Sequence, residues 1–115
     1  MANANIKVHV FLDSEGEFRV YPPVIVADAA NGAGNRDDVE FVNHTDEDLV
    51  FFTEAAVFSA APEAGTAPKQ GGKSGAKKVH STGVGQSVLH TYQVFMVQSG
   101  KKAKANSDPV IIVEN

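Results

Sequence analysis

The sequence contains no cysteine and no tryptophan among its 115 residues. Without cysteine the chain has no disulfide bond, no thiolate ligand for zinc or an iron–sulfur cluster, and no thiol nucleophile. No stretch approaches the roughly 18 apolar residues of a membrane-spanning helix, so we expect no membrane span. The net charge of −4 is mild, which argues against general affinity for nucleic acid.

The first residues also lack the basic start and apolar segment of a secretory signal peptide. A cytoplasmic location is therefore the default expectation, although a secreted chain whose signal peptide has been removed would read in the same way. Hydrophobic residues make up 43% of the chain, which is close to the globular average. We expect residues 1–115 to form a single domain, the usual outcome at this length.

Apolar residues recur with a period of two, which is the pattern of strands that bury one face. Residues 6–12 alternate in this way, and residues 18–20 resume the pattern after a turn at 13–16, which predicts a hairpin. Tyr21-Pro22-Pro23 ends that strand because proline has no N–H, so residues 24–26 begin a new segment at a sheet edge or after a crossing. Further strands are predicted at 39–43, 49–52, 87–97 and 110–113. About seven strands at this spacing predict an all-β, antiparallel Greek-key β-sandwich.

Residues 60–78 are rich in alanine, glycine, proline and lysine, and their pattern suits neither a strand pair nor a capped helix. We therefore predict a long flexible loop at about 60–86. The closing strand, Pro109 to Val113, is expected to present an unpaired edge to which a neighbouring chain could add.

Three segments resemble the cupredoxin family in order along the chain. Val39-Glu40-Phe41-Val42-Asn43 is similar to the family's strand that ends in asparagine before a polar turn. His90 to Phe95 resembles the aromatic strand that leads to the ligand cysteine in copper-binding members, and Pro109 to Val113 resembles the final strand. The similarity covers about residues 20–115 and implies a cupredoxin-like sandwich. An immunoglobulin-like sandwich is the alternative, because it shares the alternation and the asparagine turn.

The copper ligands of that family are missing. A copper centre of this kind uses two histidines and a cysteine thiolate, often with a distant methionine. Met96 and Val97 stand where the cysteine is expected, and Asp48 and Leu49 stand where the first histidine is expected. Residues 98–109 contain no histidine to supply the second. The resemblance therefore implies no copper electron transfer, and we expect no cofactor.

Other motifs give no catalytic site. Residues 67–74 fit a relaxed phosphate-loop pattern, but neither the buried strand nor the helix that the motif needs flanks them. There is no Gly-x-Ser-x-Gly nucleophile elbow. Among the four histidines, a metal site would have to use His80 and His90 together with a carboxylate.

Charge divides unevenly along the chain. Residues 1–63 contain twelve acidic and three basic residues, whereas residues 64–115 contain seven lysines and two acidic residues. If folding keeps the two sets apart, opposite charges would orient a contact between copies; if it interleaves the halves, the asymmetry disappears. The residues proposed for that interaction are Lys101, Lys102, Lys104, Asp46, Glu47 and Asp48.

We therefore predict a non-enzymatic binding or structural protein that engages another protein, or itself, through loops and edge strands. The alternative is a metal-binding protein that uses His80 and His90.

Overall fold

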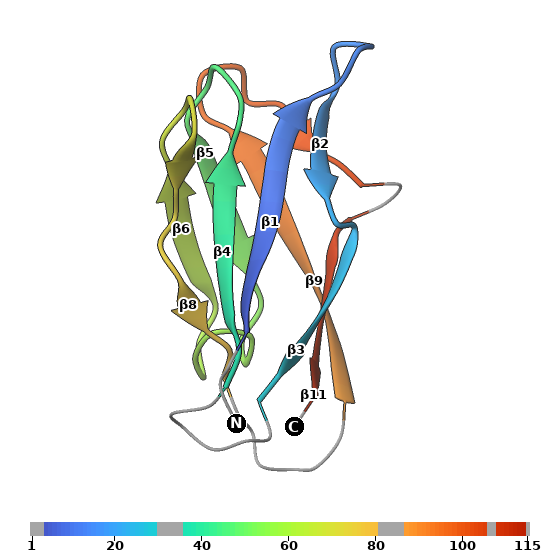
Figure 1. The fold of residues 1–115 in the computed structure, drawn as a ribbon, viewed down its shortest axis with the longest axis vertical. Helices are drawn as coiled ribbons and strands as arrows, with labels where there is room; N and C mark the ends of the chain where they lie inside the picture. The colour runs from blue at the N-terminus through green and yellow to red at the C-terminus, as the bar shows by residue number, and fades with distance from the viewer. Residues whose placement is uncertain (1–3, 30–35, 81–86, 106–107, 115) are drawn as a thin grey trace.

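The computed structural model describes residues 4–29, 36–80, 87–105 and 108–114. Within these ranges the chain forms eleven β-strands and no helix, arranged as two sheets that face each other (Figure 1). The predicted all-β sandwich is confirmed at this level. None of the described residues belongs to a helix long and apolar enough to cross a membrane.

The first sheet contains the N-terminal hairpin. Its strands run in the order β2, β1, β4, β7, with β8 also paired to β4. Asp13 shapes the hairpin turn, because its carboxylate accepts the N–H groups of Glu15 and Glu17 at 2.9 Å, and Gly16 adopts a φ of +79° that favours glycine. The predicted hairpin is confirmed. The strands are β1 (Asn5–Leu12), β2 (Phe18–Tyr21), β4 (Asp38–Asn43), β7 (Gly72–Lys73) and β8 (Lys77–Lys78).

The second sheet contains the remaining strands in the order β3, β11, β9, β5, β6, with β10 paired to β9. The chain enters this sheet at Tyr21-Pro22-Pro23, so the predicted break there is confirmed and β3 lies at the sheet edge (Figure 1). The strands are β3 (Val24–Asp28), β5 (Leu49–Thr53), β6 (Glu63–Ala67), β9 (Ser87–Met96), β10 (Lys102–Ala103) and β11 (Val110–Glu114).

The prediction of purely antiparallel sheets is wrong, because each sheet contains one parallel pair. β1 runs parallel to β4, and β3 runs parallel to β11. Both pairs join strands that are distant in sequence and that meet only after the chain has changed sheets. Alternating hydrophobicity could not reveal this, since a half-buried strand shows a period of two whichever way its neighbour runs.

The prediction that residues 60–78 contain no strand is also wrong. β6 pairs along all of β5, and β7 and β8 pair with β4. Gly65 is required in β6, because a Cβ atom there would lie 2.4 Å from Cζ of Phe51. The remainder of the predicted loop, residues 81–86, lies outside the described residues.

The closing strand does not provide a free edge, contrary to expectation. β11 lies between β3 and β9 and pairs with both. The strand at this edge of the sheet is instead β3, and within the described residues no strand pairs with its other side.

The core fills the space between the two sheets. Phe41 of the first sheet stacks on Phe51 of the second at a ring-centroid distance of 4.2 Å, and Tyr92 packs edge-on against Phe41 at 5.5 Å. All three side chains are buried. Burying an aromatic or aliphatic side chain of this size contributes about 1.5–3 kcal/mol, so these inner positions supply much of the stability.

Candidate functional site

A buried asparagine shapes the turn that the sequence analysis singled out. The Asn43 side-chain amide donates to the carbonyl oxygens of Glu47 at 2.7 Å and Ala67 at 3.1 Å. Its oxygen accepts the Thr45 N–H at 3.0 Å and the Thr45 hydroxyl at 2.8 Å. Because Asn43 and Thr45 are buried and fully bonded, they fix the backbone of the acidic turn, Asp46-Glu47-Asp48.

Two carboxylates of the acidic turn brace neighbouring loops. Asp48 accepts the backbone N–H of Lys69 at 3.0 Å and the side-chain amide of Gln98 at 3.4 Å. The N–H of Lys69, followed by the Gln98 amide, lowers the pKa of Asp48 below its ordinary value of 3.8. Glu47 accepts the backbone N–H of Ser99 at 2.6 Å. Asp46 is exposed. The turn is therefore tied to the two loops that carry Lys69 and Lys101.

The structure places the three lysines of the predicted interaction set in different surroundings. Lys101 is exposed in the turn that Glu47 braces. Lys102 forms an ion pair with Asp108 at 2.5 Å. Lys104 lies beside β2, where its backbone exchanges hydrogen bonds with Phe18 and Val20.

Of the two alternatives for the charged halves, the structure favours interleaving. The acidic turn bonds directly to loops from the lysine-rich half of the chain. Asp38 likewise lies 3.3 Å from Nζ of Lys78. At these places folding brings acidic residues of the first half of the chain next to lysine-bearing segments of the second half.

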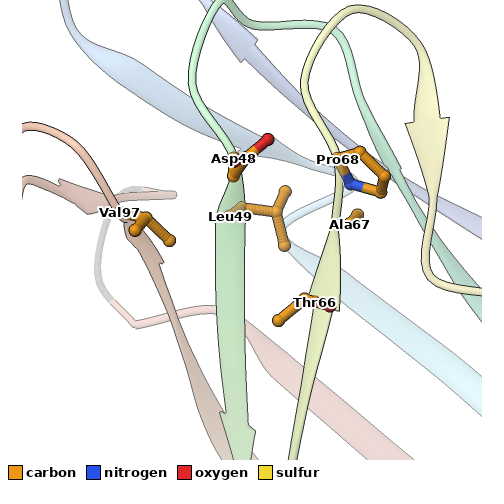
Figure 2. Close-up of a pocket in the computed structure, with 6 residues that line it drawn as sticks. All are labelled: Asp48, Leu49, Thr66, Ala67, Pro68 and Val97. Carbon is orange, nitrogen blue, oxygen red and sulfur yellow. The ribbon is translucent and has the colours of Figure 1, made fainter.

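A small hollow adjoins the acidic turn. It has a volume of about 400 Å³, and we call it the Leu49 hollow. Figure 2 shows the side chain of Leu49 on β5 directed toward Ala67 on β6, with Val97 on the other side of β5. The six residues that line it are Asp48, Leu49, Thr66, Ala67, Pro68 and Val97. The lining is mainly aliphatic, and its one ionisable group is Asp48, whose oxygens are already bonded to Lys69 and Gln98.

The Leu49 hollow joins positions that the cupredoxin resemblance had marked. Asp48 and Leu49 stand where the first copper-ligating histidine is expected, and Met96 and Val97 stand where the cysteine is expected; of these two, Val97 lines the hollow and Met96 is buried. Positions about 50 residues apart in sequence therefore line one hollow. None of the lining residues is a histidine, cysteine or methionine, so the donor set does not fit copper.

The structure gives His80 and His90 different surroundings. His90 is buried on the inner face of β9, with its Nδ1 atom 3.8 Å from Oε1 of Glu54. His80 is half-buried and donates its backbone N–H to Val57. In the part of the chain that the structure describes, no three histidine, cysteine, aspartate or glutamate residues are grouped to hold a metal ion. Neither histidine therefore belongs to a metal centre of described residues.

The one close histidine pair was not anticipated. Nδ1 of His9 lies 2.9 Å from Nε2 of His44, and the ring centroids are 5.1 Å apart. The two nitrogens lie on the line between the two ring centres, because the centroid distance is about as long as the N···N contact with one ring radius added at each end. The nitrogens therefore point at each other, as in a hydrogen bond. In that hydrogen bond one ring nitrogen donates its proton and the other accepts it, so these two nitrogens do not offer two lone pairs to a metal ion placed to one side. The parallel pairing of β1 with β4 brings these residues together, and no short-range spacing indicates it.

The outer face of the second sheet is the larger unanticipated feature. Val26 of β3, Ile112 of β11 and Leu89 of β9 stand side by side in register across this face. Val24 and Val110 form the next row. Leu89 is 62% exposed, and Val24 and Val26 are about half exposed. We call these five residues, Val24, Val26, Leu89, Val110 and Ile112, the aliphatic face.

A signal for the aliphatic face was present in the sequence. Residues 24–26 and 110–113 are apolar at every position rather than at alternate positions. Continuous runs of this kind are typical of strands that are covered on both sides. A sandwich of two layers covers only the inner side, so the second apolar side is left open.

Comparison with known proteins gave no relative. No protein-family model matches the chain, and no curated protein or solved structure is significantly similar to it.

Proposed function

We propose that this chain is a non-enzymatic binding protein that engages another protein through the aliphatic face and the adjacent edge strand β3. The observation that carries the proposal is the row Val26, Ile112, Leu89, in which three aliphatic side chains from three strands lie together in contact with water. A contiguous exposed apolar patch of this kind is uncommon on monomeric proteins and marks sites of interaction.

The composition of this face supports protein binding over other roles. Its two rows contain only aliphatic side chains and Thr91, and the charged residues Asp28 and Glu114 come at the strand ends. Interfaces have the same plan, with few charges at the centre and polar groups at the rim. A nucleic acid would require basic residues where this face has none.

We further propose that the sandwich is cupredoxin-like. One support is that each sheet contains a parallel pair, whereas an immunoglobulin-like sandwich consists of two antiparallel sheets. A second support is the convergence of Asp48, Leu49 and Val97 on the Leu49 hollow, where the resemblance expects the copper ligands. With an aspartate and two aliphatic residues in those places, the proposal includes no copper electron transfer.

The metal-binding alternative has less support. This alternative uses His80 and His90. Within the described residues, the only carboxylate that forms an ion pair with either histidine is that of Glu54, which lies near His90. A stable site requires three or four converging ligands, and one histidine with one carboxylate falls short of that number.

The proposal is tested with a charge placed in the face. Leu89→Lys puts an ammonium group into the row formed by Val26, Ile112 and Leu89. Gln93→Lys puts the same group on the same side of β9, two rows away from Leu89. Each variant is immobilised beside the wild-type chain and exposed to an extract of the source organism. We expect proteins retained by the wild type to be lost with Leu89→Lys and kept with Gln93→Lys. Equal retention by the two variants would contradict the proposed face.

A further inference from the structure

The open edge of β3 is short and has defined limits. Backbone groups of Pro23 and Ala29 bond to β11, which means that alternate residues between them, Val24, Val26 and Asp28, turn their N–H and C=O groups outward. Asp28 is already occupied, because Asp37 donates to its carbonyl oxygen at 2.8 Å and accepts its N–H at 2.9 Å. At the other end, Pro22 and Pro23 have no N–H to offer. Within the described residues, the edge available for pairing is therefore that of Val24 and Val26.

Such an edge is self-complementary. If a second copy approaches antiparallel with Ile25 on a two-fold axis, Val24 of each copy lies opposite Val26 of the other. Each outward N–H then meets an outward C=O, and the pairing ends where Asp37 and the prolines close the edge. Because the contact uses the same surface on both copies, it closes at two and does not continue into a fibre.

Charge at the two ends of β3 favours this orientation. Pro23 lines a hollow together with Arg19 and Lys104, so the start of the strand is basic. Arg19 is partly neutralised, since its Nε atom donates to Asp13 at 2.9 Å, and Lys104 is the exposed cation. At the other end Asp28, Asp37 and Glu114, which is in register with Asp28, outnumber Arg36, so this end is acidic. An antiparallel arrangement sets the basic end of each strand against the acidic end of the other.

The aliphatic face supplies apolar contact in the same arrangement. Side chains of Val24 and Val26 stand on the outer side of β3 and are about half exposed. In the two-fold pair, Val24 of one copy packs beside Val26 of the other, and aliphatic cross-strand pairs stabilise a sheet. The rows that contain Ile112 and Leu89 would continue from one copy into the next.

We infer that the partner of this edge is a second copy of the chain, joined by antiparallel pairing of the two β3 strands at Val24 and Val26. This inference rests on the proposed function, since it names the protein that occupies part of the proposed face. The pair would present a continuous sheet with one aliphatic outer surface.

Sedimentation velocity across a wide concentration series tests the inference. We expect the wild-type chain to pass from monomer to dimer. Val26→Pro removes an outward N–H that has no partner within the described residues of the monomer, and two such bonds are lost per dimer, so dimerisation should weaken about tenfold. A monomer at every concentration, or a dimer that Val26→Pro leaves unchanged, would overturn the inference.

A second pair of variants keeps the test decisive if Val26→Pro does not fold. Lys104→Glu reverses the charge at the start of β3 and should weaken the dimer, with a smaller effect at high salt. Lys101→Glu makes the same change in net charge at the turn braced by Glu47 and should not. Equal weakening by both variants would overturn the proposed register. If the wild type is monomeric, the dimer is ruled out, but the proposed binding function is not. The Leu89→Lys experiment tests that function independently.

Discussion

The outer faces of the two sheets differ in what they present to water, although both belong to strands with the same inner pattern. On the first sheet, Lys7 of β1 stands in register with Glu40 of β4 and forms an ion pair with it. Asp38 is similarly paired with Lys78 of β8. On the second sheet the corresponding outer positions are aliphatic in three adjacent strands.

This difference distinguishes the inner positions, on which the fold depends, from the outer positions, whose composition can vary. Both sheets bury their inner side chains, and that burial is sufficient to specify the two layers. Outer positions contribute less to the stability of one chain, so their composition reports on what surrounds the chain. Paired charges suit water on the first sheet, and the aliphatic face suits a protein surface.

The largest expected effect comes from comparing the two sides of one strand. Ile111 of β11 is fully buried, whereas Ile112 faces outward and is half-buried. We expect Ile111→Ala to lower the free energy of unfolding by about 2–5 kcal/mol, because it leaves a cavity. Ile112→Ala should lower it by only about 1 kcal/mol, since part of that side chain is already in water. Urea denaturation of dilute protein measures both, and equal losses would mean that the aliphatic face is covered within the monomer.

A smaller effect compares the two outer faces directly. Glu40 is 8% exposed and its carboxylate is paired with Lys7. Glu40→Gln should therefore cost roughly 1 kcal/mol of unfolding free energy, because it leaves the ammonium group of Lys7 without its partner. Leu89→Gln on the other face should change the unfolding free energy by less than about 0.5 kcal/mol. The comparison fails if dilute Leu89→Gln is the less stable of the two variants in denaturant.

The smallest expected effect on stability concerns Asp48, which lies where the two sheets meet. Asp48 begins the segment that leads into β5, and its bond to the Lys69 N–H ties that segment to the one leading into β7. Because the folded chain lowers the pKa of Asp48, the ionised group stabilises the fold above its ordinary pKa of 3.8, and that contribution is lost as the pH falls through the folded value.

Denaturation at a series of pH values checks this expectation. Asp48→Asn should be less stable than the wild type at neutral pH, and the gap should narrow below pH 3.8. Asp46→Asn provides the matched control, because Asp46 is exposed in the same turn. A gap that stays constant down to strongly acidic pH would show that the Asp48 charge contributes no stability.

Much of the fold could be predicted from the sequence. Alternation identified the seven strands that became β1, β2, β3, β4, β5, β9 and β11, and the prolines at 22 and 23 marked the change of sheet. Alternation failed at β6, where Gly65 and the alanines provide little hydrophobic signal. Gly65 is present because Phe51 fills the space above it, which is a tertiary constraint. Strand direction was also invisible, since it depends on which distant strands become neighbours.

The candidate site was predicted only in part. The sequence located Asp48, Leu49 and Val97 as altered ligand positions, and these residues share one hollow. It assigned interaction to three lysines and an acidic turn that folding places in different surroundings, because a count along the chain takes no account of strand order. The uniformly apolar runs at 24–26 and 110–113 indicated the exposed aliphatic face, which is the surface that we propose for binding.

Amide hydrogen exchange, resolved residue by residue in dilute and concentrated protein, reports directly on pairing of β3 with a second copy. We expect the amides of Val24 and Val26 to exchange more slowly as concentration rises, because their outward N–H groups become bonded to the second copy. The exchange rates of the amides of β6, the edge strand on the other side of the same sheet, should not change. Slowing confined to β6, or no slowing at Val24 and Val26 at any concentration, would show that β3 does not pair in this way.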